Sequence, residues 1–179
     1  VDIRYHSFEL MPHLPHGQAL SVHELLEREK GISLERAKAL NAQIATRGKE
    51  IGLDYQFDKA LGVNTRDAHR LSHFAKQHGK QHALMLRLFQ AFFTEGKNIG
   101  EHGVLADLAA DVGLDRAEAL DALVSDAYTD DVKNDEQDAG TLGIHGVPFF
   151  IFDGKFAVSG AQPIELFKQA LHTAWKAKA

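Results

Sequence analysis

The chain has 179 residues, of which 44% are hydrophobic and 25% charged, and it carries a formal net charge of −5. This composition is typical of a globular protein with a sizeable core and excludes the disordered class. The weak negative charge, without a block of Lys or Arg, argues against nucleic acid or an anionic membrane as a partner, and no apolar run approaches the roughly 18 residues of a membrane span.

The sequence contains no cysteine, so it forms no disulfide and offers no thiolate to a metal. Its first residues, Val1-Asp2-Ile3-Arg4-Tyr5, lack the basic region and apolar stretch that open a signal peptide. We therefore expect a cytoplasmic location. Because the first residue is not methionine, a processed or truncated start is also compatible with the sequence.

The first predicted element is a strand over residues 1–11. Apolar residues occupy positions 1, 3 and 5 and alternate with polar ones, which is the period of a half-buried strand. The apolar positions then shift to Phe8 and Leu10, which predicts a bulge or the end of the strand. Pro12 and Pro15 close it.

A run of helices is predicted next from cap residues and apolar spacing. Ser21-Val22-His23-Glu24 has the spacing of a capping box, Gly31 suits a left-handed stop, and Ser33 begins a second helix. Asn64 is predicted to cap the following helix. Four more helices are expected over residues 81–93, 101–112, 115–125 and 126–142.

The tail of the sequence changes character. Phe149-Phe150-Ile151-Phe152 is apolar on both faces, which suits a strand covered by helices on both sides. Asp153-Gly154 predicts a tight turn because both positions tolerate positive φ, and a return strand follows. Pro163 is expected in the first turn of the last helix. The order of one strand, a helical run, a hairpin and a last helix predicts an α/β domain with a helical insertion.

Several motifs resemble one known family. Residues 143–155 (GIHGVPFFIFDGK), with Ser159-Gly160-Ala161-Gln162, closely resemble the C-terminal motif of DsbA-like thioredoxin-fold proteins and are nearest to the FrnE group of dithiol–disulfide isomerases. Further stretches fit that group in the same order along the chain: Ser7-Phe8-Glu9-Leu10, Asn64-Thr65, Ala68-His69-Arg70-Leu71, Phe93-Thr94-Glu95-Gly96 and Ile99-Gly100.

The resemblance implies a DsbA-type α/β thioredoxin-like domain with an inserted all-helical domain. We expect the thioredoxin-like part at residues 1–17 and 126–179 and the insertion at residues 18–125. Family members begin with a strand and a helix that carries Cys-x-x-Cys, and this chain begins at what corresponds to the second strand. The N-terminal strand–helix unit, about 30 residues long, is thus expected to be absent from these 179 residues.

A missing interior strand would leave its neighbours with unpaired edges. Three explanations remain open at this point: the sequence is a fragment of a longer protein, another chain donates a strand, or the segment at 1–11 is repositioned.

The implied activity is that of a thiol–disulfide oxidoreductase or isomerase, with no cofactor and no catalytic residue in this chain. The resemblance makes Pro148 the family's cis-proline and gives Val147 the backbone that faces the substrate. Gly146 and His145 beside them, and His69 and Asn64 in the helical part, complete the predicted substrate-binding set: Asn64, His69, His145, Gly146, Val147 and Pro148. The predicted partners are a protein or small-molecule thiol or disulfide, with glutathione and a homodimer as further candidates.

Two other functions stay open. A related branch of the fold contains glutathione-linked transferases and isomerases, which have a serine in place of the first cysteine. A cysteine-free chain can also act without catalysis, by binding peptides or partners. Histidine pairs at i, i+4 spacing (His69 and His73, His78 and His82) suit metal ligation, but no acidic residue or cysteine accompanies them, and no metal site is expected.

Overall fold

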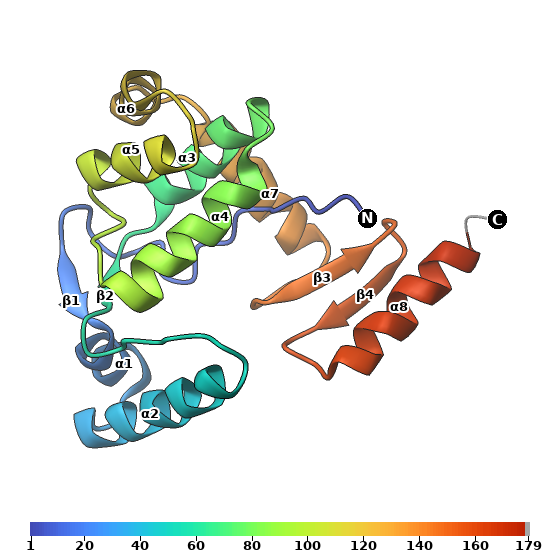
Figure 1. The fold of residues 1–179 in the computed structure, drawn as a ribbon, viewed down its shortest axis with the longest axis horizontal. Coiled ribbons are helices and arrows are strands. Elements are labelled where there is room, and N and C mark those ends of the chain that lie inside the picture. Colours follow the sequence, from blue (N-terminus) through green and yellow to red (C-terminus); the bar gives the residue numbers. More distant parts are fainter. Residues whose placement is uncertain (178–179) are drawn as a thin grey trace. The chain divides into compact units, whose positions relative to one another are not determined.

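The computed structural model describes residues 1–177 and divides into two compact units, Val1–Lys133 and the part from Asn134 onward. The elements follow in the order β1 (Ala19–Ser21), α1 (Val22–Lys30), α2 (Leu34–Glu50), β2 (Leu61–Val63), α3 (Arg66–Gln77), α4 (Gln81–Gln90), the π-helix η1 (Ala91–Glu95), α5 (His102–Asp111), α6 (Arg116–Val124), α7 (Thr129–Thr141), β3 (Phe149–Phe152), β4 (Phe156–Ser159) and α8 (Ile164–Lys176) (Figure 1). The division expected from the sequence, with a thioredoxin-like part at residues 1–17 and 126–179 and a helical insertion at residues 18–125, stays a prediction.

The predicted helix starts in the first unit are confirmed where a side chain caps the backbone. Ser21 accepts a hydrogen bond from the Glu24 N–H, and the Glu24 carboxylate accepts one from the Ser21 N–H, so the capping box is complete. Gly31 ends α1 in the left-handed conformation, and Ser33 caps α2 through the Arg36 N–H. Local sequence therefore determines where both helices begin.

The predicted strand at residues 1–11 is wrong, because this segment pairs with no strand in the described chain. The Gln81 side chain takes the place of a neighbouring strand: its Oε1 accepts from the Tyr5 N–H at 3.2 Å and its Nε2 donates to the Tyr5 carbonyl at 3.0 Å. The ladder of this unit instead joins β1 to β2 in antiparallel register, with Leu20 opposite Gly62. Neither strand was predicted, because each has only three residues.

The shift of the apolar positions to Phe8 and Leu10, which predicted a bulge or the end of a strand, is not matched by a shift in burial. The buried positions continue the original parity as Ser7 and Glu9, whereas Leu10 is exposed. Ser7 Oγ lies 3.0 Å from His73 Nε2, a buried hydrogen bond across 66 positions of sequence. A polar residue thus points inward because a distant polar group meets it there.

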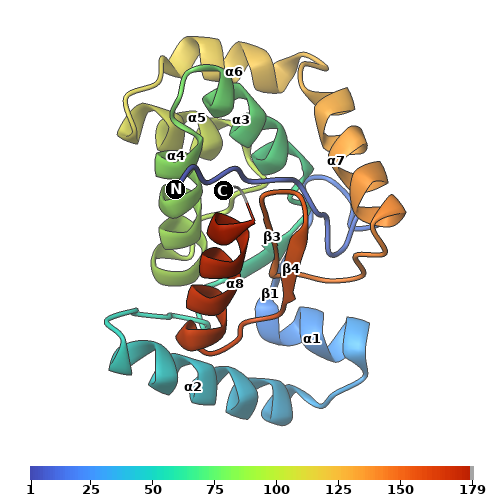
Figure 2. The same cartoon turned by 90° about the vertical axis from the view of Figure 1, so that its right-hand side faces the viewer.

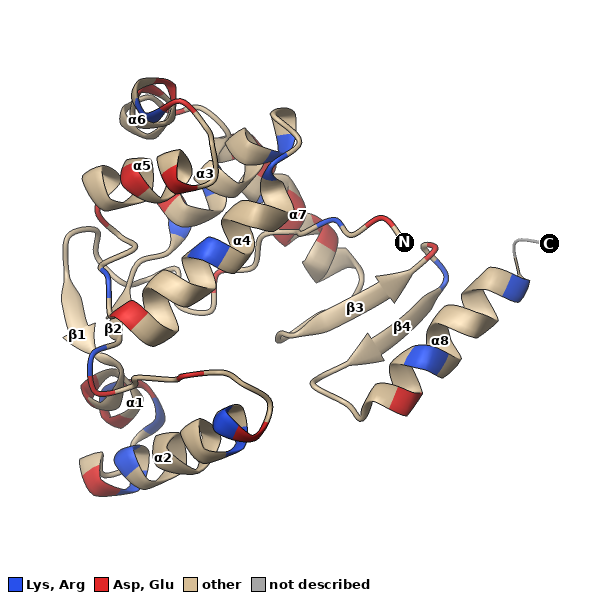
Figure 3. Cartoon of the chain, viewed as in Figure 1, with Lys and Arg blue, Asp and Glu red and all other residues tan. Residues whose placement is uncertain are grey.

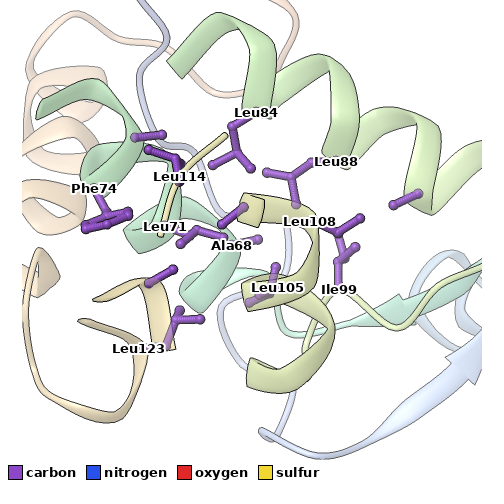
Figure 4. Packing of buried hydrophobic residues seen from close by; sticks show 14 of the residues in the cluster. Ala68, Leu71, Phe74, Leu84, Leu88, Ile99, Leu105, Leu108, Leu114 and Leu123 are labelled. Carbon is purple, nitrogen blue, oxygen red and sulfur yellow. The ribbon is translucent and has the colours of Figure 1, made fainter. Parts of the chain in front are cut away.

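The hydrophobic core of the first unit lies between α3, α4, α5 and α6 (Figure 4). Its fully buried leucines include Leu71 from α3, Leu84 from α4 and Leu105 from α5. Each fully buried leucine contributes about 1.5–3 kcal/mol relative to an exposed one. Apolar residues three and four positions apart give each of these helices one inward face.

An aromatic cluster joins the end of this core to the loop before β2. The ring of Phe93, in η1, contacts Tyr55 at 5.3 Å and Phe57 at 6.1 Å between centroids. The loop is held to η1 by the backbone, since the Gln56 N–H donates to the Phe93 carbonyl at 2.7 Å. The chain then turns at Gly96 in the left-handed conformation (φ 67°).

The second unit is a β-hairpin with one helix alongside it, as Figures 1 and 2 both show. β3 and β4 are antiparallel, with Phe150 opposite Val158. Asp153 and Gly154 both have positive φ, as predicted for the turn. Phe167 of α8 meets the Phe150 ring edge to face at a centroid distance of 4.8 Å, which holds the helix on the hairpin.

None of the helices in residues 1–177 combines the length and the apolar character needed to cross a membrane.

Candidate functional site

The loop between α7 and β3 carries four of the predicted substrate-binding residues. α7 ends with Gly143 in the left-handed conformation, and the Ile144 N–H donates back to the Ala139 carbonyl at 2.9 Å. The Gly143 N–H also donates to the Gly140 carbonyl at 3.1 Å. These two hydrogen bonds at the end of the helix fix the direction in which the loop leaves it. His145, Gly146, Val147 and Pro148 then follow one another into β3.

The Val147–Pro148 peptide bond is cis in the structure. The Pro148 carbonyl accepts a hydrogen bond from the Gly160 N–H at 2.8 Å, which ties the entry of β3 to the exit of β4. Val147 is 46% exposed, and within residues 1–177 its backbone N–H and carbonyl have no hydrogen-bond partner. His145 is exposed and Gly146 half-buried. The loop thus presents an open stretch of backbone on an anchored strand.

Asn64 lies in the first unit and is buried. Its Nδ2 donates to the Leu14 carbonyl at 2.7 Å, and its Oδ1 accepts from the Arg66 N–H at 2.9 Å. The predicted cap is therefore one position off: Thr65 is the N-cap of α3 and makes no side-chain cap bond, while Asn64, just before it, binds the first N–H of the helix and also fixes the Pro-rich loop. Its amide is engaged at both ends, and its contact with substrate stays a prediction.

His69 is half-buried on the first turns of α3, where its N–H donates to the Thr65 carbonyl. A role for it in substrate binding also stays a prediction. Of the other paired histidines, His73 bonds to Ser7, and His82 Nδ1 lies 2.8 Å from the Tyr5 hydroxyl. Within the part of the chain that the structure describes, no group of three histidine or acidic side chains is placed to hold a metal.

A buried ionic cluster surrounds Asp67 and was not predicted from the sequence. Asp67 Oδ1 accepts from Arg70 Nη1 at 2.8 Å, and Asp67 Oδ2 lies 2.7 Å from His102 Nε2. His16 Nδ1 lies 3.8 Å from the same oxygen. The i, i+3 spacing of Asp67 and Arg70 was a visible signal, but His102 stands 35 positions away and no local pattern connects it.

The surroundings of Asp67 act on its pKa in opposite directions. Burial acts to raise the pKa of this carboxyl, but the hydrogen bonds from His102 and Arg70 outweigh it and hold the pKa below its ordinary value. The cluster joins α3, the start of α5 and the loop after α6 within the first unit, so it stabilises the fold when Asp67 is ionised.

Asp67→Asn is expected to lower the free energy of unfolding near pH 7. It should also make that free energy depend less on pH in the acid range. A lowered folded-state pKa means that the stabilisation is fully present above the unfolded value of 3.8 and is lost as pH falls through the folded-state pKa. The difference in unfolding free energy between the two proteins should therefore shrink below about pH 4. Urea denaturation monitored by circular dichroism from pH 7 to 2.5 measures it; a difference that stays constant with pH would contradict the role of Asp67.

The helical unit, the anchored hairpin with its flanking helix and the exposed Val147-Pro148 loop define a thioredoxin-like α/β protein with a helical insertion. A family profile for the DSBA-like thioredoxin domain matches residues 1–172. The chain belongs to this family, and the fold expected from the sequence is confirmed.

Three proteins are similar to the chain. The crystal structure of a probable DsbA oxidoreductase from Streptomyces coelicolor superimposes with a TM-score of 0.90 at 36% identity, covering 96% of this chain and 74% of that one. A candidate protein disulfide isomerase from Nitrosomonas europaea shares the fold, with a TM-score of 0.68 at 20% identity over 88% of this chain and 90% of its own. The uncharacterized protein YwbO of Bacillus subtilis is 38% identical over 107 residues, 59% of this chain and about half (53%) of that protein.

Proposed function

We propose that this chain supplies the substrate-binding part of a thiol–disulfide oxidoreductase or isomerase of the FrnE type. The observation that carries the proposal is the Val147 backbone, exposed and without a partner in residues 1–177, immediately before the anchored Pro148. An extended substrate segment would lie beside it and exchange backbone hydrogen bonds with the Val147 N–H and carbonyl. Main-chain pairing of this kind gives affinity without demanding a particular side chain.

The reaction itself would be thiolate attack on a sulfur of the substrate disulfide. That attack forms a mixed disulfide and releases one substrate thiolate, and a second thiol then resolves the intermediate. The chain has no cysteine, so both thiols would come from outside these 179 residues.

Three further proposals concern the partners and the location of the protein. Glutathione would be the small-molecule thiol, a second copy of the chain the protein partner, and the cytoplasm the location. Oxidised glutathione is a second probe of the loop, because the related branch of the fold is glutathione-linked.

The test is binding of a short extended peptide that contains one cysteine capped as a methyl disulfide, followed by NMR on the ¹⁵N-labelled chain. The Val147 amide is expected to shift. A peptide N-methylated beside its cysteine should bind about fivefold more weakly, since one backbone hydrogen bond contributes about 1 kcal/mol.

Two substitutions separate backbone from side-chain recognition. Val147→Pro removes the N–H and should weaken binding by a similar factor, whereas Val147→Ala keeps it and should bind almost normally. Equal losses in the two variants, or an unmoved Val147 amide, would contradict the proposal. A response of that amide to oxidised glutathione but not to the peptide would point to glutathione-linked chemistry instead.

A further inference from the structure

The outer edge of β4 carries backbone groups that point away from the hairpin. The Gly160 N–H donates to the Pro148 carbonyl, so these two residues form a hydrogen-bonded pair of the antiparallel ladder. Bonded and non-bonded pairs alternate along such a ladder, and Ala157, opposite Ile151, belongs to a non-bonded pair. The Ala157 N–H and carbonyl therefore point outward, and they have no partner within residues 1–177.

A groove of about 660 Å³ lies between this edge and α8. The helix lines it with Leu166, Ala170 and Thr173, whose spacing of four and three residues places them within about 60° of one another around the helix axis. Spacing of this kind is typical of a seam along which two helices pack. Leu166 is 41% exposed, and the small side chain of Ala170 in the middle of the seam lets a second helix come close.

The strand edge and the helix seam have their centres at the same height. α8 runs antiparallel to β4 (Figure 1), and its Phe167 packs against Phe150, which is opposite Val158. Ala157 is one residue back along β4, about 3.3 Å, and Ala170 is three residues further along α8, about 4.5 Å. Both steps run in the same direction, so Ala157 and Ala170 lie level to within about 1 Å.

We propose that β4 and α8 form the contact surface of a homodimer whose two-fold axis passes beside Ala157 and Ala170. β4 pairs antiparallel with β4 of the second copy, and the Ala157 N–H of each copy donates to the Ala157 carbonyl of the other. Phe156 then lies opposite Val158 of the second copy, an aromatic and β-branched pair that stabilises a sheet. The proposal gives the second copy, proposed above as the protein partner, its contact surface, and it does not depend on peptide binding at Val147.

The same axis brings the two α8 helices side by side in antiparallel directions. α8 contacts both β3 and β4, and neighbouring strands are about 4.8 Å apart, so the two helix axes would lie about 9–10 Å apart, the usual spacing of packed helices. Ala170 then meets Ala170 of the second copy. Leu166 lies within about 2 Å of Thr173 of the second copy along the helix axis. Each seam is therefore covered by the same seam of the other copy.

The charges of α8 fit an antiparallel pair of helices. Glu165 lies at the start of the helix, Lys168 near its middle and Lys176 at its end (Figure 3). Glu165 and Lys176 are about 20° apart around the axis, on the side opposite to Phe167 and therefore away from the sheet. The pair brings Glu165 of each copy to about the same height as Lys176 of the other, while the two glutamates stay about 15 Å apart along the axis.

A second copy is the occupant that fits both parts of this surface. A foreign extended peptide would also pair with the edge of β4, but it would bring no helix to cover Leu166 on α8. On the strand, Lys155 lies opposite Ser159 of the second copy, so no like charges face each other.

Single cysteines test the register of the two strands, because the chain has none of its own. In Ala157→Cys the two Cα atoms would be about 5.5 Å apart, within the range of a disulfide. Ser159→Cys is the matched control: it lies on the same face of the same strand, but the two copies of position 159 would be about 13 Å apart along it. Under mild oxidation Ala157→Cys should form a covalent dimer at least about tenfold faster than Ser159→Cys. Equal rates would overturn the proposal.

Sedimentation equilibrium of the full chain, without peptide, measures the association itself. The weight-average mass should rise from 19.8 kDa toward twice that value with concentration. Ala157→Pro removes the outward N–H, which the β3–β4 ladder does not use, and should weaken association by about tenfold or more because each dimer loses two hydrogen bonds. Ala157→Ser keeps the N–H and should associate normally, and circular dichroism should show both variants folded.

A wild-type chain that stays monomeric at the highest concentration, or two variants that associate equally, would overturn the proposal. Both variants should bind the capped peptide as the wild-type chain does, since Val147 is unchanged. Failure of the dimer is thereby distinguished from failure of the proposed function.

Discussion

Arg70→Met is expected to destabilise the first unit by about 3–5 kcal/mol, the usual cost of removing one partner of a buried ion pair. The guanidinium binds the Asp67 carboxylate and also donates to four backbone carbonyls. The carbonyl acceptors belong to Ala122, Leu123, Ser125 and Ala127. Methionine fills a similar volume without a donor, so the carboxylate would stay buried without its main cation.

The position of these carbonyls explains why one side chain has so large an effect. Ala122 and Leu123 lie in the last turn of α6, where the chain offers carbonyls without partners inside the helix. A cation at a helix C-terminus also interacts favourably with the helix dipole. Arg70 thus binds the carbonyls at the C-terminus of α6 and holds the following loop on α3. Its loss would free the end of α6 and this loop from α3.

Urea denaturation followed at 222 nm measures the effect. The matched control is Arg116→Met, which removes an arginine whose 2.7 Å pair with Asp107 is exposed on both sides. That variant should lose less than about 1 kcal/mol. Similar losses in the two variants would show that the buried carbonyl contacts of Arg70 contribute little.

Gly96→Ala is expected to destabilise the chain by about 3 kcal/mol, from left-handed strain of about 1–2 kcal/mol and a steric overlap of about 1–3 kcal/mol. Gly96 has φ 67°, and an added Cβ would lie 2.6 Å from the Lys59 carbonyl oxygen. Because the Lys59 backbone lies on one side of Gly96 and its own tight turn on the other, the added methyl group has little room to move away. The change should loosen the loop bound to η1 through Gln56 and Phe93.

A Gly→Ala substitution at another position should not destabilise the chain. Gly103 lies in α5 with nothing within 4 Å of an added Cβ and no positive φ. Gly103→Ala should be neutral or stabilising by up to about 1 kcal/mol, because alanine favours a helix. Thermal unfolding of both variants checks the pair; destabilisation by both would show that the close approach at Lys59 is not the cause.

Local patterns in the sequence predicted most of the second unit and the helix starts of the first. Ser21 with Glu24, Ser33, and the Asp153-Gly154 turn act through neighbours a few residues away, so their structures follow from the residues themselves. The family motifs around Val147 and Pro148 likewise placed the chain in its family.

By itself, the sequence determined the α/β class, the family and the absence of any thiol for exchange chemistry. Only the tertiary structure decided the course of residues 1–9, the inward turn of Ser7 and Glu9, and the cluster of Asp67 with His102. Each depends on hydrogen bonds between distant residues, as with Tyr5 and Gln81, 76 positions apart. The spacing of apolar residues does not predict such pairs. A polar side chain is stable in the protein interior only when folding brings its hydrogen-bond partner to it.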